Sequence, residues 1–274
     1  MSNKNSKVIE EFGHEWTKFN YSNIDKKKLK ENFEEYFNII PDNFFSNKSV
    51  GFDMGCGSGR WAQFVAPKVK HLNCIEPSNA INVAKQNLKQ FKNISFYNET
   101  TETCSIKLGT QDFGYCLGVL HHIPNAEKAL GDCSKLLKKG GHLLIYMYYN
   151  LENKPLWFRL IWRMSEFLRK LISKLPKSPK LFFCNLIAFI IYFPFSKAAL
   201  YLEKLGLNVE NIPLSEYRNK PFYQCKNDAL DRFGTKLEQR FSKLQISEML
   251  KKTGFDKIKF SKKPPYWCCV AIKK

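Results

Sequence analysis

Three glycines alternate within residues 55–59 of the stretch SVGFDMGCGSGRW, directly after a short apolar run. The run at 49–54 predicts a buried strand, and glycine lets the backbone behind it turn sharply and approach a ligand closely. Parallel sheets bind ligands at the carboxyl ends of their strands. The stretch therefore predicts an α/β fold with a ligand site after its first strand, although a tight turn without a ligand is the simpler alternative.

Strand and helix patterns alternate along the rest of the chain, which predicts a parallel sheet with helices on both faces. Further strands are expected at 70–75, 94–97, 113–119, 142–149, 255–260 and 266–272. Helices are expected at 60–65, at 79–90 with Ser78 as N-cap, at 125–137 with KKGG as its end, and before Gly254. The whole predicts one sheet of about seven strands with a large insertion after the fifth.

This pattern divides the chain into four parts. Residues 1–47 are expected to form an N-terminal helical cap, 48–149 a ligand-binding core, 150–236 a helical insertion or substrate lid, and 237–274 the closing helix and strands. Within the insertion, 151–205 reads as mostly helical and 206–236 as loop with short elements.

The insertion contains the apolar run LFFCNLIAFIIYFPF at 181–195. A helix that spans a membrane needs about 20 apolar residues, and this run has 15, contains Asn185 and is interrupted by Pro194. A buried helix is the simplest interpretation. A helix at a bilayer surface is the alternative, because ten Lys and Arg face three acids between 152 and 204, and a lid over an apolar substrate is a third. The segment 156–205 is therefore a candidate for peripheral membrane contact.

Charge and cysteine content narrow the function classes. The net charge of +19 is compatible with a nucleic-acid or membrane partner, but only seven residues are Arg, and a lysine-coated surface without a partner is the simpler interpretation. Nucleic acid is therefore not the expected partner. Nine scattered Cys without a C-x-x-C pair predict neither a disulfide framework nor a metal site, and the polar N-terminus predicts a cytoplasmic location.

Two acids indicate which ligand the glycines serve. Asp53 stands just before the glycines, where it would repel a diphosphate and attract a cation. Glu76 ends the second predicted strand, 21 residues after Gly55, and an acid near that spacing binds ribose hydroxyls. The glycine spacing is G-x-G-x-G, whereas dinucleotide sites use G-x-G-x-x-G. A cationic nucleoside such as S-adenosylmethionine fits these residues better than a dinucleotide.

Several segments resemble the class I S-adenosylmethionine-dependent methyltransferases. GFDMGCGSGRWA is similar to their first motif and CIEPS to their acidic second-strand motif. DFGYCLGVLHHIPN and ALGDCSKLLKKGGHLLIYMY resemble the fourth and fifth strands of the subgroup that includes ubiquinone and menaquinone biosynthesis methyltransferases. The resemblance covers 48–149 and KLQISEMLKKTGF. It implies a Rossmann-like, mostly parallel sheet of order 3-2-1-4-5-7-6 and a substrate lid in the insertion.

The resemblance also implies cofactor contacts. Asp53, Gly55 and Gly57 would hold the methionine part, Glu76 the ribose, and Thr101 and Glu102 would flank the adenine. Leu120 and His121 would lie by the methyl-transfer face, and further candidates for cofactor binding are Gly59, Pro77 and Leu117. The usual Asp of the adenine loop is missing here.

The candidate catalytic residues are His121 and His122, which follow the fourth predicted strand. Either could be the general base for a hydroxyl acceptor, and packing histidines are the simpler alternative. Tyr148, Tyr217 and Arg218 are candidates for acceptor binding, and a salt-bridged helix turn is the simpler interpretation of the last two.

The N-terminal segment EEFGHEWTKFNY offers one more candidate, Trp16, with His14 and Phe19 beside it. It reads either as a cap over the cofactor or as a surface helix whose rings pack on the core.

The sequence thus predicts a methyltransferase that acts on an oxygen atom of a small molecule and releases S-adenosylhomocysteine. The alternatives are a methyltransferase for a quinone or lipid-borne acceptor at a membrane, an RNA methyltransferase, and a nucleoside-binding protein without chemistry.

Overall fold

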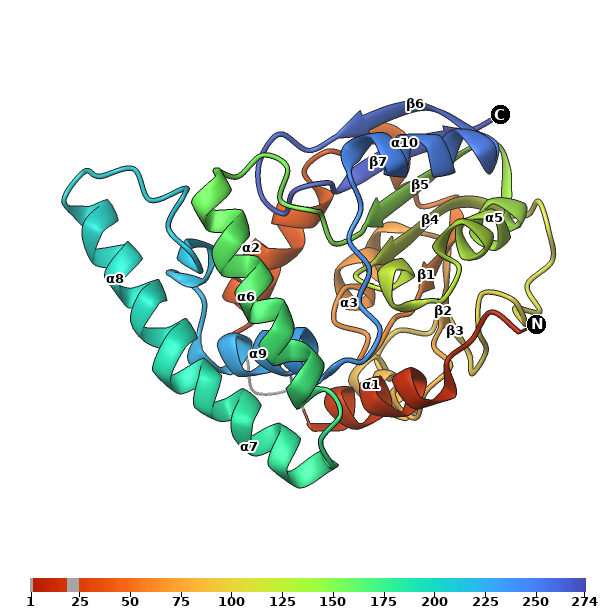
Figure 1. The fold of residues 1–274 in the computed structure, drawn as a ribbon. Helices are drawn as coiled ribbons and strands as arrows, with labels where there is room; N and C mark the ends of the chain where they lie inside the picture. Colours follow the sequence, from red (N-terminus) through yellow and green to blue (C-terminus); the bar gives the residue numbers. More distant parts are fainter. Residues whose placement is uncertain (1, 19–24) are drawn as a thin grey trace. The chain divides into compact units, whose positions relative to one another are not determined.

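A computed structural model describes residues 2–18 and 25–274 of the protein. The chain forms two compact units (Figure 1). The core unit comprises the residues up to 150 together with 239–274, and the insertion unit comprises 151–238.

The core unit contains one seven-stranded sheet of order β3-β2-β1-β4-β5-β7-β6. Its strands are β1 (Val50–Met54), β2 (His71–Ile75), β3 (Ile94–Tyr97), β4 (Gln111–Leu117), β5 (Leu137–Tyr146), β6 (Phe255–Phe260) and β7 (Cys269–Lys273). All neighbours pair in parallel except β7, which is antiparallel to both β5 and β6. The predicted fold class and strand order are confirmed.

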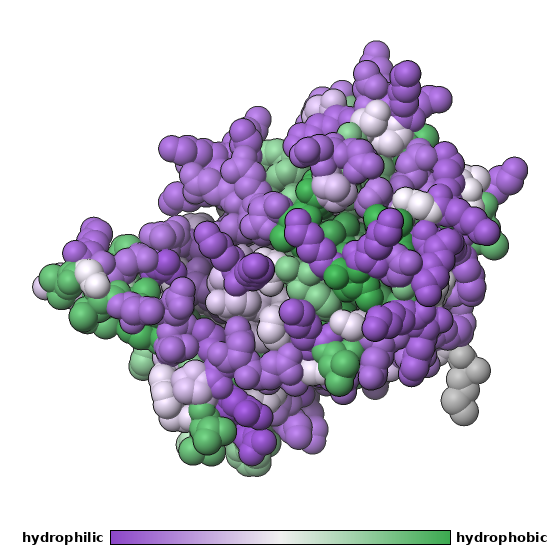
Figure 2. Space-filling model, turned by 90° about the horizontal axis from the view of Figure 1, so that it is seen from above, coloured by the Kyte–Doolittle hydropathy of each residue, from purple (hydrophilic) through white to green (hydrophobic). Residues whose placement is uncertain are grey.

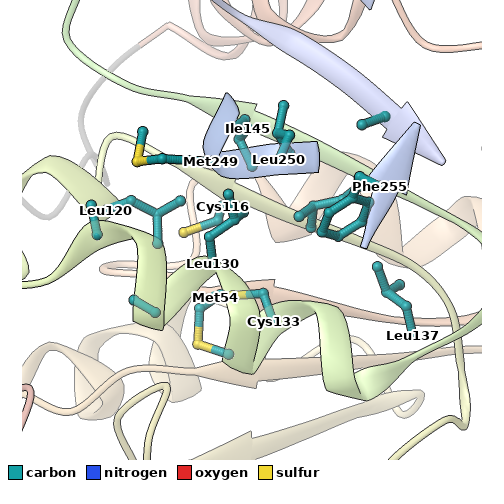
Figure 3. Packing of buried hydrophobic residues seen from close by; sticks show 14 of the residues in the cluster. Met54, Cys116, Leu120, Leu130, Cys133, Leu137, Ile145, Met249, Leu250 and Phe255 are labelled. Atoms are coloured by element: carbon teal, nitrogen blue, oxygen red, sulfur yellow. The ribbon is translucent and has the colours of Figure 1, made fainter. Parts of the chain in front are cut away.

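Helices cover both faces of the sheet, because alternate residues of a strand point to opposite faces. On one face α5 (Ala126–Leu136) and α10 (Lys243–Lys252) pack on the sheet in a core that includes Met54, Leu130 and Leu250 (Figure 3). On the other face, the Phe37 ring of α2 (Lys26–Phe37) lies 5.4 Å from the Tyr115 ring of β4. The remaining elements of this unit are α1 (Ser6–Lys18), α3 (Ala62–Val65), α4 (Ala80–Asn87) and the short η1 (Asp42–Phe44), η2 (Ala66–Lys68) and η3 (Leu120–His122).

Some predicted boundaries are wrong. Helix α4 starts at Ala80 with Asn79 as its N-cap, and the Ser78 hydroxyl accepts a hydrogen bond from the Ala80 N–H. The KKGG stretch does not end α5 but lies in β5, whose pairing with β4 shifts between Gln111↔Leu137 and Phe113↔His142. This irregularity absorbs the extra residues and lets the strand start early. Strand β7 starts three residues later than predicted.

The insertion unit is helical. It contains α6 (Leu156–Ile172), α7 (Lys177–Ile187), the π-helical η4 (Ala188–Tyr192), α8 (Phe193–Lys204), η5 (Ser215–Tyr217) and α9 (Phe222–Gly234). Its core joins residues of α7 and η4 to Cys225, Ala229 and Phe233 of α9. The prediction of loop for 206–236 is wrong at α9, because polar Gln224 and Asn227 are buried there beside the apolar residues and weaken the hydrophobic pattern.

The apolar run at 181–195 lies in a longer helix than the sequence predicts. Elements α7, η4 and α8 are continuous over Lys177–Lys204, 28 residues, which is long and apolar enough to cross a membrane by length and composition. Pro194 does not break the helix, because it lies in the first turn of α8, just after the wider π-helical turn. The helix is buried on one face only, so the prediction of a buried helix is half right.

Candidate functional site

The glycine loop follows β1 and turns back over β2. The N–H groups of Gly55 and Cys56 both donate to the carbonyl of Ile75, at 2.8 and 3.0 Å. Gly55, Gly57 and Gly59 all have positive φ, between +54° and +79°, a region that side chains with a Cβ disfavour. The loop also has no room for a side chain at Gly55, since a Cβ there would lie 2.4 Å from Cγ2 of Val119. Both constraints require glycine and keep the loop tight.

Replacing Gly55 by alanine is expected to destabilise the protein more than replacing Gly140. Both glycines have φ of +77°, so the backbone strain of alanine, about 1 kcal/mol, is common to both. Only Gly55 is crowded, because a Cβ on Gly140 would meet nothing within 4 Å. Overpacking against the stiff Val119 side chain should add roughly 1–3 kcal/mol. Urea unfolding of Gly55→Ala and Gly140→Ala measures the difference, and equal losses would contradict the crowding.

Asp53 lies on β1 with 2% of its surface exposed. Its Oδ2 atom has no hydrogen-bond partner among the described residues. Burial raises the pKa of Asp53 to about 8, and the nearby Glu76 carboxylate adds to the rise, while the Tyr115 hydroxyl and Arg60 oppose it. A buried carboxyl group with an unfilled acceptor costs free energy that a bound cation would recover.

Glu76 follows β2 and is joined to the glycine loop. Its Oε2 atom accepts a hydrogen bond from the N–H of Gly57 at 3.1 Å, and its Oε1 atom accepts two from the N–H and hydroxyl of Ser78. Burial raises the pKa of Glu76, and these hydrogen bonds oppose the rise. The carboxylate is therefore fixed in orientation, and each oxygen keeps acceptor capacity for a ligand. Pro77 lies between Glu76 and Ser78, and its contact with a cofactor stays a prediction.

Helix α1 lies on this loop. A Cβ on Gly57 would approach the Trp16 ring to 3.1 Å, and one on Gly13 would approach Ser78 to 3.1 Å. The guanidinium of Arg60 lies 4.8 Å from the centre of the Trp16 ring. Trp16 thus closes one side of the glycine loop. Phe19 lies outside the described residues.

The predicted adenine contacts occupy the loop after β3. Thr101 is buried, whereas Glu102 is bound to other parts of the core unit. Its carboxylate accepts hydrogen bonds from the N–H of Asn3 and the hydroxyl of Ser2, and it forms an ion pair with Lys128. The Lys128 ammonium lowers the pKa of Glu102 to about 2. These contacts tie the N-terminus to α5, and the role of Thr101 and Glu102 toward adenine stays a prediction.

Leu117 and Leu120 stand at the end of β4 and in η3. Leu120 is fully buried in the hydrophobic core beside Leu130 (Figure 3), and Leu117 is 7% exposed. Their cofactor contacts stay predictions, and the structure gives Leu120 a packing role.

His121 belongs to an aromatic cluster at the carboxyl ends of β4 and β5. Its ring stacks on that of Tyr148 with 3.8 Å between centres, and it lies 4.1 Å from His122. It is fully buried, and neither ring nitrogen has a hydrogen-bond partner among the described residues. Burial holds its pKa well below the usual value, and His122 and Arg240 lower it further. His121 is therefore neutral at pH 7, with a ring nitrogen able to take a proton.

The structure adds two residues that the sequence analysis missed, Gln239 and Arg240. The Gln239 side chain donates to the carbonyl of Ile123 at 2.7 Å, and its N–H donates to the carbonyl of His121 at 3.0 Å. The Arg240 guanidinium lies 5.1 Å from the centre of the Tyr148 ring and donates to the carbonyl of Tyr149. Gln239 thus holds the His121 segment in place, and Arg240 holds the segment that follows β5. They follow the insertion in sequence, so no local motif joins them to the site.

Two strand ends meet where the insertion leaves and rejoins the core unit. The N–H of Phe241 donates to the carbonyl of Tyr148 at 2.9 Å, and the N–H of Asn150 donates to the carbonyl of Phe241 at 3.1 Å. Tyr149 and Phe241 form an isolated parallel bridge.

Tyr217 and Arg218 belong to the insertion unit. The Arg218 guanidinium makes a bidentate ion pair with Glu203, at 2.7 and 2.8 Å. The centre of the Tyr217 ring lies 5.2 Å from that of the Tyr192 ring. This is the salt-bridged turn that the sequence left open, and acceptor binding by these two residues stays a prediction.

Residues 52–145 match the family model described as a methyltransferase domain. Among curated proteins, the ubiquinone biosynthesis O-methyltransferase of Alkalilimnicola ehrlichii is 29% identical over 125 residues, which cover 44% of this chain and 49% of that protein. The chain spans about half the length of the curated relatives it matches. The resemblance predicted from the motifs is confirmed.

Solved structures agree on the fold. A Thermotoga maritima SAM-dependent methyltransferase, described as a possible histamine N-methyltransferase, superposes with a TM-score of 0.50 at 16% identity, over 98% of this chain and 99% of that one. Haemonchus contortus phosphoethanolamine N-methyltransferase 2, solved with phosphomonomethylethanolamine and S-adenosylhomocysteine, gives 0.51 at 17% identity, over 93% and 43%.

Proposed function

We propose that this chain, whose core carries a methyltransferase domain, transfers a methyl group from S-adenosylmethionine to a hydroxyl oxygen of a small acceptor. The observation that carries the proposal is the buried Asp53 carboxyl group, whose Oδ2 atom has no partner among the residues described, directly before the glycine loop. When bound, S-adenosylmethionine supplies a methyl group already activated by its sulfonium.

The residues around the loop fit this cofactor. Asp53 offers a carboxylate to an ammonium group, and a cation nearby offsets the cost of its burial. Gly55 and Gly57 keep the loop free of side-chain bulk, and Glu76 presents fixed oxygens to ribose hydroxyls. The Trp16 ring packs against the loop at Gly57. The cofactor residues are thus complementary in charge and in shape.

The aromatic cluster supports oxygen as the methylated atom. His121 is neutral and can take the hydroxyl proton onto a ring nitrogen, which leaves an oxygen nucleophile. Tyr148 stacks on the imidazole and fixes its plane. The Arg240 guanidinium lies over the same Tyr148 ring. Arg240 also adds positive charge near a developing oxyanion. Relatives named as ubiquinone biosynthesis O-methyltransferases support the same assignment.

Calorimetric titration with S-adenosylhomocysteine and transfer of labelled methyl groups test the proposal. The protein should bind S-adenosylhomocysteine and should label at least one phenol or catechol from a panel that also contains matched amines and thiols. Labelling of amines alone would refute oxygen as the methylated atom. Failure of the folded protein to bind S-adenosylhomocysteine would refute the cofactor.

Binding of S-adenosylhomocysteine is expected to strengthen as the pH rises from 6 to 8. Asp53 is protonated below its pKa of about 8, and it must lose that proton to pair with an ammonium group. Affinity should therefore rise by up to about tenfold per pH unit and level off above pH 8. Calorimetry in buffers of different ionisation enthalpy measures the released proton. Asp53→Asn should release none, and release equal to that of the wild type would assign the proton to another group.

A further inference from the structure

The insertion unit exposes large apolar side chains in helical order. On α6, Leu160, Met164, Phe167 and Leu171 follow a spacing of four, three and four residues and are between 52% and 69% exposed. On the continuous helix Lys177–Lys204, Phe182 and Phe189 are two turns apart and 63% and 64% exposed. We call these six residues the outer apolar face. Single exposed apolar residues are common on protein surfaces, whereas ordered rows of them indicate a binding surface.

The opposite face of the long helix is committed to protein packing. Cys184, Ile187 and Tyr192 are buried against Cys225 and Ala229 of α9. Helix α9 in turn joins α6, because Arg232 forms an ion pair with Glu166 at 2.9 Å. A helix surrounded by lipid could not keep these contacts. The structure therefore favours a helix that lies along a surface over one that crosses a membrane, although its length would allow crossing.

Positive charge concentrates where α6 turns into α7. Lys170, Lys174 and Lys177 are exposed within eight residues of chain, and Arg163 is exposed further up α6. Arginines already pair with two of the three acids between 152 and 204. Glu166 pairs with Arg169 and Arg232, and Glu203 pairs with Arg218. The basic residues at the turn therefore give this surface a net positive charge.

We infer that the insertion unit docks on an anionic lipid bilayer, with the outer apolar face at the headgroup boundary and the lysines of the α6–α7 turn against lipid phosphates. Apolar rows beside basic residues are the pattern of helices that lie in a bilayer interface. Hydrophobic side chains also reach the surface among hydrophilic ones at the left of Figure 2, where α8 lies, outside the six residues of the outer apolar face. The net charge of +19 opposes pairing with a second copy, and phosphates alone would not explain the apolar rows.

Flotation of the full chain with vesicles tests this inference without any dependence on catalysis. The wild type should float with vesicles of 70% phosphatidylcholine and 30% phosphatidylglycerol, and far less with pure phosphatidylcholine. Lys170→Glu/Lys174→Glu/Lys177→Glu should lower partition by about 100-fold. Its control is Lys85→Glu/Lys89→Glu/Lys92→Glu, which makes the same charge change at exposed lysines of the core unit and should float like the wild type.

A second pair of variants tests the apolar face. Phe167→Glu/Phe182→Glu should lower partition by about tenfold or more, because both side chains would leave the lipid. The control Leu108→Glu/Leu244→Glu alters two core-unit residues of similar exposure, 62% and 68%, and should float normally. Helical circular dichroism and S-adenosylhomocysteine binding check that each variant is folded. No flotation of the wild type, or equal losses in variants and controls, would overturn the inference. The inference would also be overturned if the protein forms a concentration-dependent dimer that Phe167→Glu/Phe182→Glu dissociates, while no variant alters flotation. The outer apolar face would then bind a second copy.

Discussion

Replacement of Asp53 by asparagine is expected to weaken binding of S-adenosylhomocysteine strongly and, at the same time, to stabilise the unliganded protein. Removal of one partner from a buried charge pair costs about 3 kcal/mol or more, so affinity should fall by roughly 150-fold. The free energy of unfolding of the unliganded protein should increase, however, because the variant no longer buries a carboxyl group whose pKa is raised to about 8.

The gain in stability has a defined pH dependence. The Asp53 carboxyl group ionises near pH 3.8 in the unfolded chain but only near pH 8 in the folded chain, so folding takes up a proton between these values. The free energy of unfolding of the wild type should therefore fall as the pH rises from about 4 to about 8. At pH 7 it should be roughly 4 kcal/mol lower than at pH 4. Asparagine does not titrate, so the variant should lose this part of the slope.

Urea unfolding at pH 5, 7 and 8.5 measures both effects, with calorimetry for the ligand. Asp256→Asn is the matched control, because it removes the same charge from an exposed side chain of β6 and should leave stability within about 0.5 kcal/mol. An Asp53→Asn variant that binds S-adenosylhomocysteine as the wild type does would falsify the role of this carboxylate. A variant less stable than the wild type at pH 8.5 would contradict the assigned pKa.

Replacement of His121 by glutamine is expected to lower kcat by about 10²–10⁴-fold while the affinity for S-adenosylhomocysteine stays within about twofold. Glutamine keeps a polar side chain beside Tyr148 but cannot take a proton at neutral pH. His142→Gln is the matched control. His142 also has a pKa lowered by burial, but it stands near the middle of β5, 5.9 Å from the Phe44 ring.

The pH profile separates a base from a packing residue. The pKa of His121 is well below its usual value, so the wild-type kcat, measured at saturating S-adenosylmethionine, should stay flat below pH 6.5 until the imidazole is protonated. In His121→Gln the rate should instead rise about tenfold per pH unit as the acceptor hydroxyl ionises unaided. A parallel drop at every pH, accompanied by lost stability, would assign His121 to packing.

The grouping of Asp53, Glu76 and the glycine loop could be predicted from the sequence because these residues follow strand ends in local motifs. Asp53 and Glu76 each stand directly at the end of a buried strand, and the glycines stand next to Asp53. Side-by-side pairing of β1 and β2 then brings these groups together without help from distant segments. The order of all seven strands followed from the same motifs through the family resemblance.

The surroundings of His121 could not be predicted in this way. Gln239 and Arg240 reach His121 and Tyr148 only because the chain returns to the sheet after the whole insertion. Helix α9 hides polar Asn227 in its buried face, and the long helix passes Pro194 through a π-helical turn, which no simple period predicts. Tertiary packing, rather than local preference, decides these features.

The bridge between Tyr149 and Phe241 has a consequence for how such an enzyme can change over time. The two points at which the insertion departs and returns are already fastened to each other by the backbone, through Tyr148, Asn150 and Phe241. The insertion therefore begins and ends at neighbouring points beside the sheet. A shorter or differently folded insertion can be exchanged there without a shift in β5 or in the residues around Asp53. Under the proposed function, acceptor preference can then diverge while the proposed methyl-donor site is kept.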